Sequence, residues 1–246
     1  CTEMREEKNV TTSSSSVFRK VLAISIPILF FTASLWLIAW IADGLMLRNA
    51  KEVPRSKRAV LAIRDSVPSY EQFGTEIFTE PYLNAYYDES YFFTQKGRND
   101  QKELILESLK RLTTNYDCVD IFILAHTNPY LYWFETLPKN LRQKIRLVYN
   151  TGCQNADQGE RWLKLGTKAY IGHKGKTSLS PFFYVYFLRR WVSGHRLNIA
   201  VKESNKIARD EINLFKDHLP NPENMDYTVQ THAHLFGSPT LQIDEL

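Results

Sequence analysis

The chain has 246 residues, of which 43% are hydrophobic and 24% charged, and its formal net charge at pH 7 is +4. This composition predicts a globular protein. The excess positive charge is scattered and forms no basic stripe of the kind that follows a phosphate backbone, so nucleic acid is not an expected partner. The cysteines, Cys1, Cys118 and Cys153, provide no disulfide framework and no Cys-x-x-Cys metal or redox motif.

An uncharged apolar segment covers residues 21–42 and is long enough to cross a membrane as a helix. Trp36 and Trp40 lie toward its second end, where indole rings favour the membrane interface. A cleaved signal peptide is the competing interpretation, but its apolar core would be unusually long and no small-residue cleavage site follows cleanly. We therefore predict a single-pass transmembrane helix within 21–47, after a polar segment 1–20.

A basic juxtamembrane linker is expected over residues 48–58, and one domain over 59–246. Lysine and arginine residues flank the apolar segment on both sides, so the positive-inside rule barely determines orientation. It slightly favours a cytoplasmic location for the C-terminal domain. The sequence therefore predicts a membrane protein whose folded domain follows its anchor.

Residues 59–246 alternate between strand-like and helix-like segments. Apolar and β-branched runs predict strands at 59–63, 84–94, 119–125, 145–149, 168–172 and 240–243. Helical spacing predicts helices at 100–116, 159–165, 180–194 and 197–214, with a short helix or turn at 137–143 and a loop at 67–81. This alternation is typical of an α/β domain with a mostly parallel sheet.

The helix at 100–116 has the clearest local signals. Asp100 is followed three residues later by Glu103, as in a capping box. Its expected inward-facing residues recur at helical spacing and are Leu104, Ile105, Leu109 and Leu112.

His126 and Cys153 each follow a strongly apolar, strand-like run. Continuous apolar runs of this length suit strands that are buried on both faces of a parallel sheet. Functional groups gather at the carboxyl ends of such strands. If the two strands are neighbours, an imidazole and a thiol meet at one edge of the sheet, which is the arrangement of a Cys/His hydrolase.

The competing interpretation is that the thiol is an inert core filler, since cysteines are among the most buried residues. Gly152 before Cys153 and the polar run 154–159 after it favour a turn instead, close to the expected helix 159–165. His232 and His234 lie two residues apart, which places both rings on one face of a strand. No third ligand is evident, so we interpret this pair as a structural or surface feature rather than a metal site.

The order of these motifs resembles the caspase-like clan of cysteine peptidases, which includes caspases, legumains, gingipains, separase and bacterial caspase-like domains. The resemblance covers about residues 59–245, and it rests on the segments 121–126, 147–154, 170–172, 191–205 and 235–241. It implies a three-layer α/β fold with a mostly parallel central sheet. It also implies a His126/Cys153 dyad that cleaves peptide bonds in a peptide or protein substrate, with no metal or organic cofactor.

By the same resemblance, Cys153 attacks the scissile carbonyl and His126 protonates the leaving amine. Thr127, Gly152 and Gln154 are the expected oxyanion or substrate-binding positions. The loop 172–176 and the segment around Ser66 are candidates for the pocket that selects the side chain before the cut.

The sequence departs from the clan pattern at two places. Thr127 stands where the clan usually has a glycine, and Gln154 and Asn155 stand where it usually has a small residue and a glycine. The alternative function is therefore a catalytically inactive module that binds peptides or partner proteins at the membrane.

Two other thiol chemistries fit less well. A phosphatase needs Cys-x5-Arg to cradle phosphate, whereas Arg161 lies eight residues after Cys153. A redox thiol needs a resolving cysteine, and Cys118 should lie a strand's length away.

Overall fold

The computed structural model describes residues 57–96, 101–125 and 129–245, together with scattered positions between 25 and 44. The chain divides into two compact units, Cys1–Asn49 and Ala50–Leu246. In the first unit the described positions are helical. Across the described positions, no helix combines the length and the apolar character needed to cross a membrane. Much of the predicted anchor at 21–42 lies outside the described residues.

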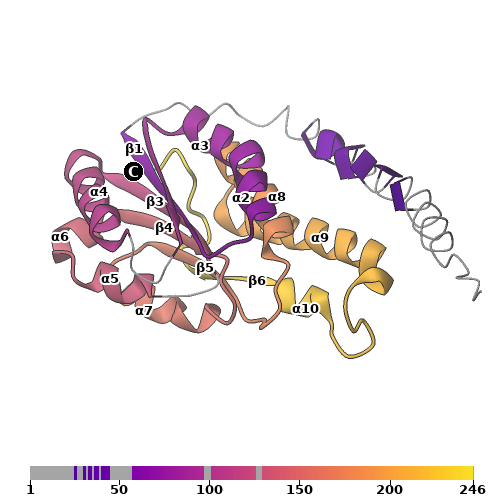
Figure 1. The fold of residues 1–246 in the computed structure, drawn as a ribbon. Coiled ribbons are helices and arrows are strands. Elements are labelled where there is room, and N and C mark those ends of the chain that lie inside the picture. The colour runs from indigo at the N-terminus through magenta and orange to yellow at the C-terminus, as the bar shows by residue number, and fades with distance from the viewer. Residues whose placement is uncertain are drawn as a thin grey trace, which may run out of the picture. The chain divides into compact units, whose positions relative to one another are not determined.

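The second unit is built on a six-stranded sheet with the order β2-β1-β3-β4-β5-β6 (Figure 1). Strands β1 to β5 pair in parallel, and β6 is antiparallel to β5. The predicted α/β fold with a mostly parallel sheet is therefore confirmed, as is the pairing of the two strands that precede His126 and Cys153. The strands are β1 Arg58–Asp65, β2 Glu89–Gln95, β3 Cys118–Ala125, β4 Ile145–Asn150, β5 Ala169–His173 and β6 Ala233–Gly237.

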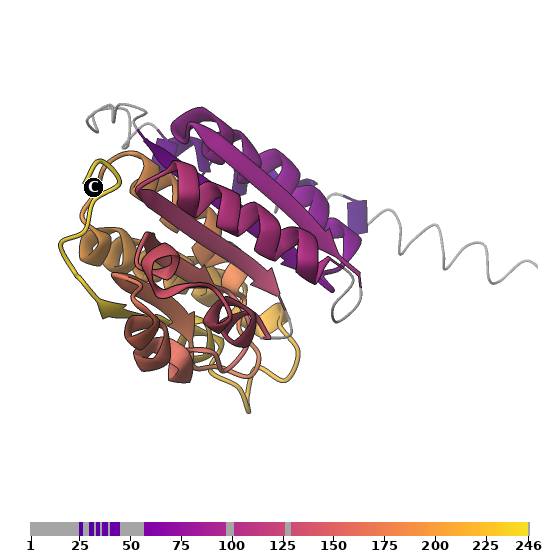
Figure 2. The same ribbon diagram turned by 90° about the vertical axis from the view of Figure 1, so that its left-hand side faces the viewer.

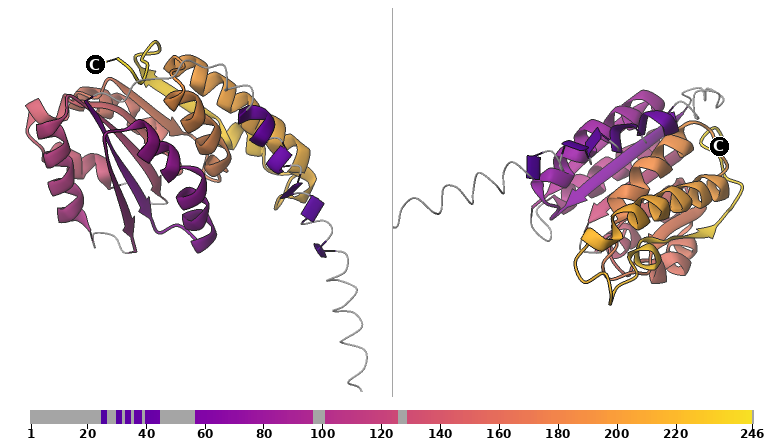
Figure 3. Two further views of the ribbon diagram at one scale, coloured as in Figure 1. Left: turned by 90° about the horizontal axis from the view of Figure 1, so that it is seen from above. Right: turned by 90° about the vertical axis from the view of Figure 1, so that its right-hand side faces the viewer.

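Helices cover both faces of the sheet and give three layers, which are visible from two directions in Figures 2 and 3. One face carries α4 Lys102–Asn115, α5 Tyr130–Glu135, α6 Lys139–Arg142 and α7 Gly159–Leu165. The other carries α2 Ser69–Phe78, α3 Glu80–Tyr86, α8 Ser180–Val192 and α9 Leu197–Phe215. Helix α10 Tyr227–Thr231 and the 3₁₀ turns η1 Ala156–Gln158 and η2 Lys216–His218 complete the described elements of this unit.

Two hydrophobic cores lie on opposite faces of the sheet because its central strands are covered on both sides. Every residue of β3 and β4 is buried. Alternate side chains along them point to different cores: Ile121 and Val148 pack beneath α4, α5 and α7, whereas Phe122 and Tyr149 pack beneath α3, α8 and α9. This two-sided burial is why both strands are apolar without alternation.

The loop predicted at 67–81 is wrong, because this stretch contains all of α2 and the start of α3. Pro68 lies at the N-cap of α2, and Pro81 in the first turn of α3. Proline suits a helix start, since its missing N–H is not needed there. The strand predicted at 84–94 begins only at Glu89, because residues up to Tyr86 belong to α3.

The strand predicted at 240–243 is also wrong. Leu241 and Pro239 instead accept hydrogen bonds from the backbone N–H groups of Leu197 and Asn198, at 2.8 and 2.9 Å. These groups lie in the first turn of α9, where N–H donors have no partner within the helix. The last strand is therefore β6, and the segment after it caps α9.

Helix α4 is confirmed, and Ile105, Leu109 and Leu112 are buried in it as predicted. Leu104 is 57% exposed. The helix presents a narrower apolar stripe to the sheet than the sequence pattern indicates. Asp100, the predicted N-cap, lies outside the described residues.

A buried ion pair lies near the amino ends of the central strands β3 and β4. The Arg146 guanidinium donates to both carboxylate oxygens of Asp120, at 3.0 and 2.7 Å, and to the carbonyl oxygens of Ile243 and Glu245, both at 2.7 Å. Burial by itself would lower the pKa of Arg146, but the Asp120 carboxylate raises it above its ordinary value, so the guanidinium stays charged. The pair holds the C-terminal segment against the amino ends of β3 and β4.

Removing one partner of this pair should be costly, because the other charge would stay buried without compensation. We expect Asp120→Ala to lower the free energy of unfolding by about 3–5 kcal/mol in a denaturant titration. The matched control is Glu135→Ala, which removes the half-exposed partner of Arg161 and should cost less than about 1 kcal/mol. Equal losses in the two variants would contradict a structural role for the buried pair.

Candidate functional site

The ends of β3 and β4 touch at the carboxyl edge of the sheet. The backbone N–H of Thr151 donates to the carbonyl oxygen of Ile123 at 2.8 Å, so the pairing extends one residue beyond β4. A Cβ atom added at Gly152 would lie 2.9 Å from the carbonyl oxygen of Ala125, which is closer than real side chains come. Glycine is therefore required for the two backbones to approach. The next residues in the chain are Cys153 after Gly152 and His126 after Ala125.

His126 and Thr127 lie outside the described residues, and their roles stay predictions. The described chain resumes at Pro129, and α5 begins at Tyr130. Tyr130 donates its hydroxyl to the Asp65 carboxylate at 2.7 Å. On the two sides of His126 and Thr127, the end of β3 is held in the sheet and the start of α5 is held by this hydrogen bond.

Asp65 was not identified from the sequence, although it lies at the same edge of the sheet. It ends β1 in register with Ala125, and it is fully buried. Besides Tyr130, the side chains of Gln95 and Ser66 donate to it, at 3.2 and 2.8 Å. Ser66, a predicted pocket residue, thus lies beside a buried carboxylate that ties β1, β2 and α5 together.

Cys153 lies on a tight turn after β4 and is partly exposed, as expected from the polar residues around it. The Asn150 side chain accepts a hydrogen bond from the Gly152 N–H at 3.0 Å. Gln154 has a left-handed backbone conformation, with φ of 53°, which costs a residue with a side chain about 1–3 kcal/mol. Its N–H donates to the carbonyl oxygen of Gly175 at 3.0 Å, which brings the predicted pocket loop 172–176 beside the cysteine turn.

Asn155 clamps the cysteine turn to two strands. Its amide nitrogen donates to the carbonyl oxygen of Asn150 at 2.7 Å, and its amide oxygen accepts from the backbone N–H of His173 at 2.8 Å. Its own carbonyl accepts from the Tyr170 hydroxyl at 2.9 Å. Asn155, which departs from the clan pattern, is therefore a buried support for Cys153, and β4 and β5 both hold it.

His173 supports this clamp as a neutral side chain. Its ring lies 2.8 Å from the carbonyl oxygen of Thr231 through Nδ1 and 3.0 Å from the Tyr149 hydroxyl through Nε2. Nδ1 must donate to the carbonyl, so Nε2 accepts from the hydroxyl. Burial lowers the pKa of His173 to about 4. The imidazole is thus uncharged at neutral pH, and it ties β5 to α10 and to β4.

The backbone N–H groups around the thiol differ in their availability. Those of Gly152 and Gln154, both predicted oxyanion or substrate-binding positions, already donate within the protein. The N–H of Cys153 has no partner in the part of the chain that the structure describes. Cys153 itself is therefore the candidate oxyanion donor on this turn.

Cys118 lies at the opposite edge of the sheet. It is the first residue of β3 and is buried, with its Sγ 3.8 Å from the carbonyl oxygen of Glu245. Burial raises the pKa of its thiol. The length of β3 separates the two cysteines by roughly 20 Å. Cys118 therefore cannot act as a resolving thiol for Cys153 within this fold.

His232 and His234 lie side by side, with ring centroids 5.1 Å apart. Within residues 57–96, 101–125, 129–245 and the scattered earlier positions, no three histidine, cysteine or acidic side chains are grouped so that they could hold a metal ion.

Comparison with known proteins finds similarity only among solved structures. No protein-family model and no curated protein matches the chain. Among solved structures, it is similar to a chain in the crystal structure of the Saccharomyces cerevisiae separase–securin complex, with 10% sequence identity and a TM-score of 0.44. The match covers 78% of this chain and 12% of that chain.

The two internal thiols should differ sharply in reactivity. Cys153 is partly exposed on its turn, whereas Cys118 is buried with a raised pKa, and only the thiolate reacts. In the folded protein at neutral pH, iodoacetamide should modify Cys153 well before Cys118, as followed by peptide mass spectrometry. Unfolding in denaturant should abolish the difference. Equal labelling of both thiols in the folded protein would show that Cys153 is not the accessible nucleophile.

Proposed function

We propose that the chain is a caspase-like cysteine peptidase in which Cys153 is the nucleophile and His126 moves the proton. One observation carries this proposal. Gly152 and Ala125 meet at the carboxyl ends of two neighbouring parallel strands, and each directly precedes one of the two residues. Groups at this edge of an open α/β sheet are the usual site of chemistry.

In the proposed reaction, the Cys153 thiolate attacks the carbonyl carbon of a peptide bond and forms an acyl-enzyme. His126 donates a proton to the leaving amine, then takes one from the water that hydrolyses the acyl-enzyme. The free Cys153 N–H stabilises the oxyanion, a contribution of about 3 kcal/mol for one donor. Asn155 and Gly175 keep the turn in place during both steps through their hydrogen bonds.

The proposed substrate is a peptide or protein, and the loop 172–176 is the proposed wall of its binding pocket. This loop is firmly supported on the side away from Cys153. A Cβ atom at Gly175 would lie 2.2 Å from the carbonyl oxygen of Gln230, and the Gln230 side chain accepts from the Lys176 N–H at 2.8 Å. Lys174 and Lys176 are exposed on either side of this contact.

A second candidate function is an inactive module that binds peptides or partner proteins. It is favoured by the N–H groups of Gly152 and Gln154, which are both used internally, and by Thr127 in place of the clan's glycine. In this alternative the same edge of the sheet binds an extended chain without cleaving it.

We also propose that residues 21–42 anchor the protein in a membrane. Among the described positions of this segment, Phe30, Phe31 and Ile38 are exposed on a helix. Exposed side chains of this size gain free energy from transfer into lipid.

Turnover tests the dyad. Against a mixed peptide library, Cys153→Ala should abolish cleavage, and His126→Ala should lower the rate by roughly 10²-fold or more, the usual scale for a general acid–base group. Rates are normalised to folded protein, and the melting temperature of His126→Ala should stay within a few degrees of wild type. Cleavage by Cys153→Ala at the wild-type rate would reject the peptidase. Peptide binding without cleavage by the wild-type protein would favour the inactive module.

Fractionation tests the anchor. The full chain should stay in the membrane fraction through an alkaline carbonate wash, because an inserted helix is not released by loss of ionic contacts. A truncated chain that starts at Val53 should be soluble and folded. Release of the full chain by the wash would contradict the anchor.

A further inference from the structure

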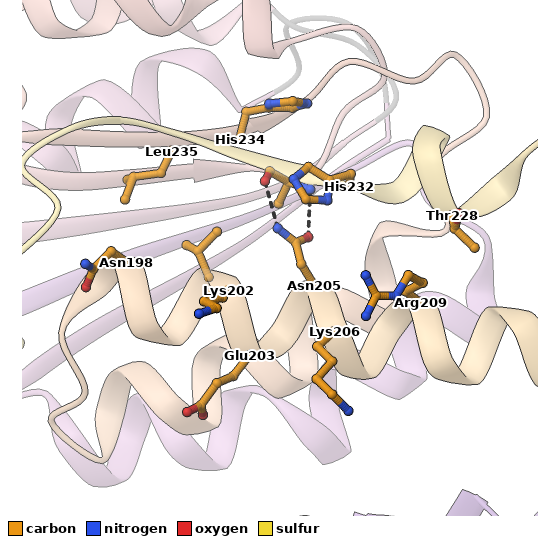
Figure 4. A pocket seen from close by; sticks show the side chains of 12 residues that line it. Asn198, Lys202, Glu203, Asn205, Lys206, Arg209, Thr228, His232, His234 and Leu235 are labelled. Carbon is orange, nitrogen blue, oxygen red and sulfur yellow. Dashed lines mark hydrogen bonds between the residues drawn. The ribbon is translucent and has the colours of Figure 1, made fainter.

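A cavity of about 550 Å³ lies between α9, α10 and β6. Its size falls within the usual range for small-molecule sites. Figure 4 shows Asn205 reaching from α9 to the strand, with Lys202 and Arg209 on either side of it along the helix. Its polar lining includes Lys202, Asn205, Lys206, Arg209, His232 and His234.

Positive charge dominates the lining. Lys202, Lys206 and Arg209 recur at helical spacing, so α9 presents them on one face. The lining contains one carboxylate, Glu203, and it is paired with Arg190 at 2.9 Å. Asp210 contacts Lys206 at 2.8 Å and Arg209 at 3.7 Å. These pairs are exposed and therefore weak, so both cations can turn to an anionic ligand.

The floor of the cavity is rigid. The Asn205 side chain donates to the carbonyl oxygen of Ala233 and accepts from its N–H, each at 2.9 Å. Strand β6 is the last strand of the sheet, so no further strand pairs with its outer side. At Ala233 the Asn205 amide takes that place by bonding both the backbone N–H and the carbonyl oxygen. Because Asn205 and Ala233 are already held in place, they lose little conformational entropy when a ligand binds.

Burial and nearby positive groups both lower the pKa values of His232 and His234. The pKa of His234 is lowered by burial, by His232 and by Lys174, and that of His232 by burial and by Arg209. In the empty cavity both rings are therefore held neutral. An anion bound beside Arg209 would raise the pKa of His232, because it favours the protonated ring.

We propose that this cavity binds a soluble ligand through a phosphate group. A phosphate carries a charge of about −1.5 to −2 and three strong acceptor oxygens at neutral pH. The matching donors are the guanidinium of Arg209, the ammonium groups of Lys202 and Lys206, and the ring of His232 beside Asn205. His234 points to the other side of the strand (Figure 4). The cavity is separate from the cysteine turn, so this inference does not depend on the proposed peptidase.

The test is calorimetric titration of the full chain in detergent with inorganic pyrophosphate as the probe. Lys202→Gln/Lys206→Gln should weaken saturable binding at least about tenfold. The matched control, Lys102→Gln/Lys110→Gln, removes the same charge from α4 on the other face of the sheet and should bind as wild type does. In histidine NMR spectra, pyrophosphate should raise the pKa of His232.

Several results would overturn the proposal: no saturable binding of pyrophosphate by the wild-type protein, equal loss in the two double variants, or no change at His232. Citrate is the competing anion in the same titration. Binding of citrate as tight as that of pyrophosphate would reject a phosphate site in favour of general attraction for anions.

Discussion

The site depends on the parallel pairing of β3 with β4, continued past the strand ends by the turn that carries Cys153. The pairing brings the Gly152 backbone against Ala125, at a distance only glycine allows. Asn155 then fixes the turn by bonding to the ends of β4 and β5 together. If this amide were lost, two buried backbone groups, the Asn150 carbonyl and the His173 N–H, would lose their partner, and each such group costs about 1–3 kcal/mol. The position of the thiol is thus set by backbone contacts rather than by side-chain packing.

The amino and carboxyl ends of the parallel strands differ in structure. At the amino edge, Arg146 and Asp120 bind the C-terminal segment in a closed, fully bonded network. At the carboxyl edge, the turn with Cys153 leaves its thiol partly exposed and one N–H free within the described chain.

The hydrophobic periodicity of the sequence correctly predicted the strands and helices that are uniformly buried. It gave wrong predictions where an element is determined by contacts between residues distant in sequence. The central strands are buried on both faces, so their apolar runs were unambiguous. The stretch 67–81 was predicted as a loop, although Pro68 and Pro81 each lie at the start of a helix. A proline that starts a helix and one that breaks it look alike in sequence. Cys153 was found from its glycine and polar neighbours. Asn155 was taken only as a departure from a pattern, because a buried amide that bridges two strands has no local signature.

The rate of Cys153 alkylation at neutral pH, compared between wild type and His126→Ala, tests most directly whether thiol and imidazole act together. If they form a dyad, the imidazole favours the reactive thiolate, and the wild-type protein should react markedly faster than His126→Ala, with the fold retained in both. Equal rates for the two proteins would contradict the account, because they would show that His126 has no influence on the thiol.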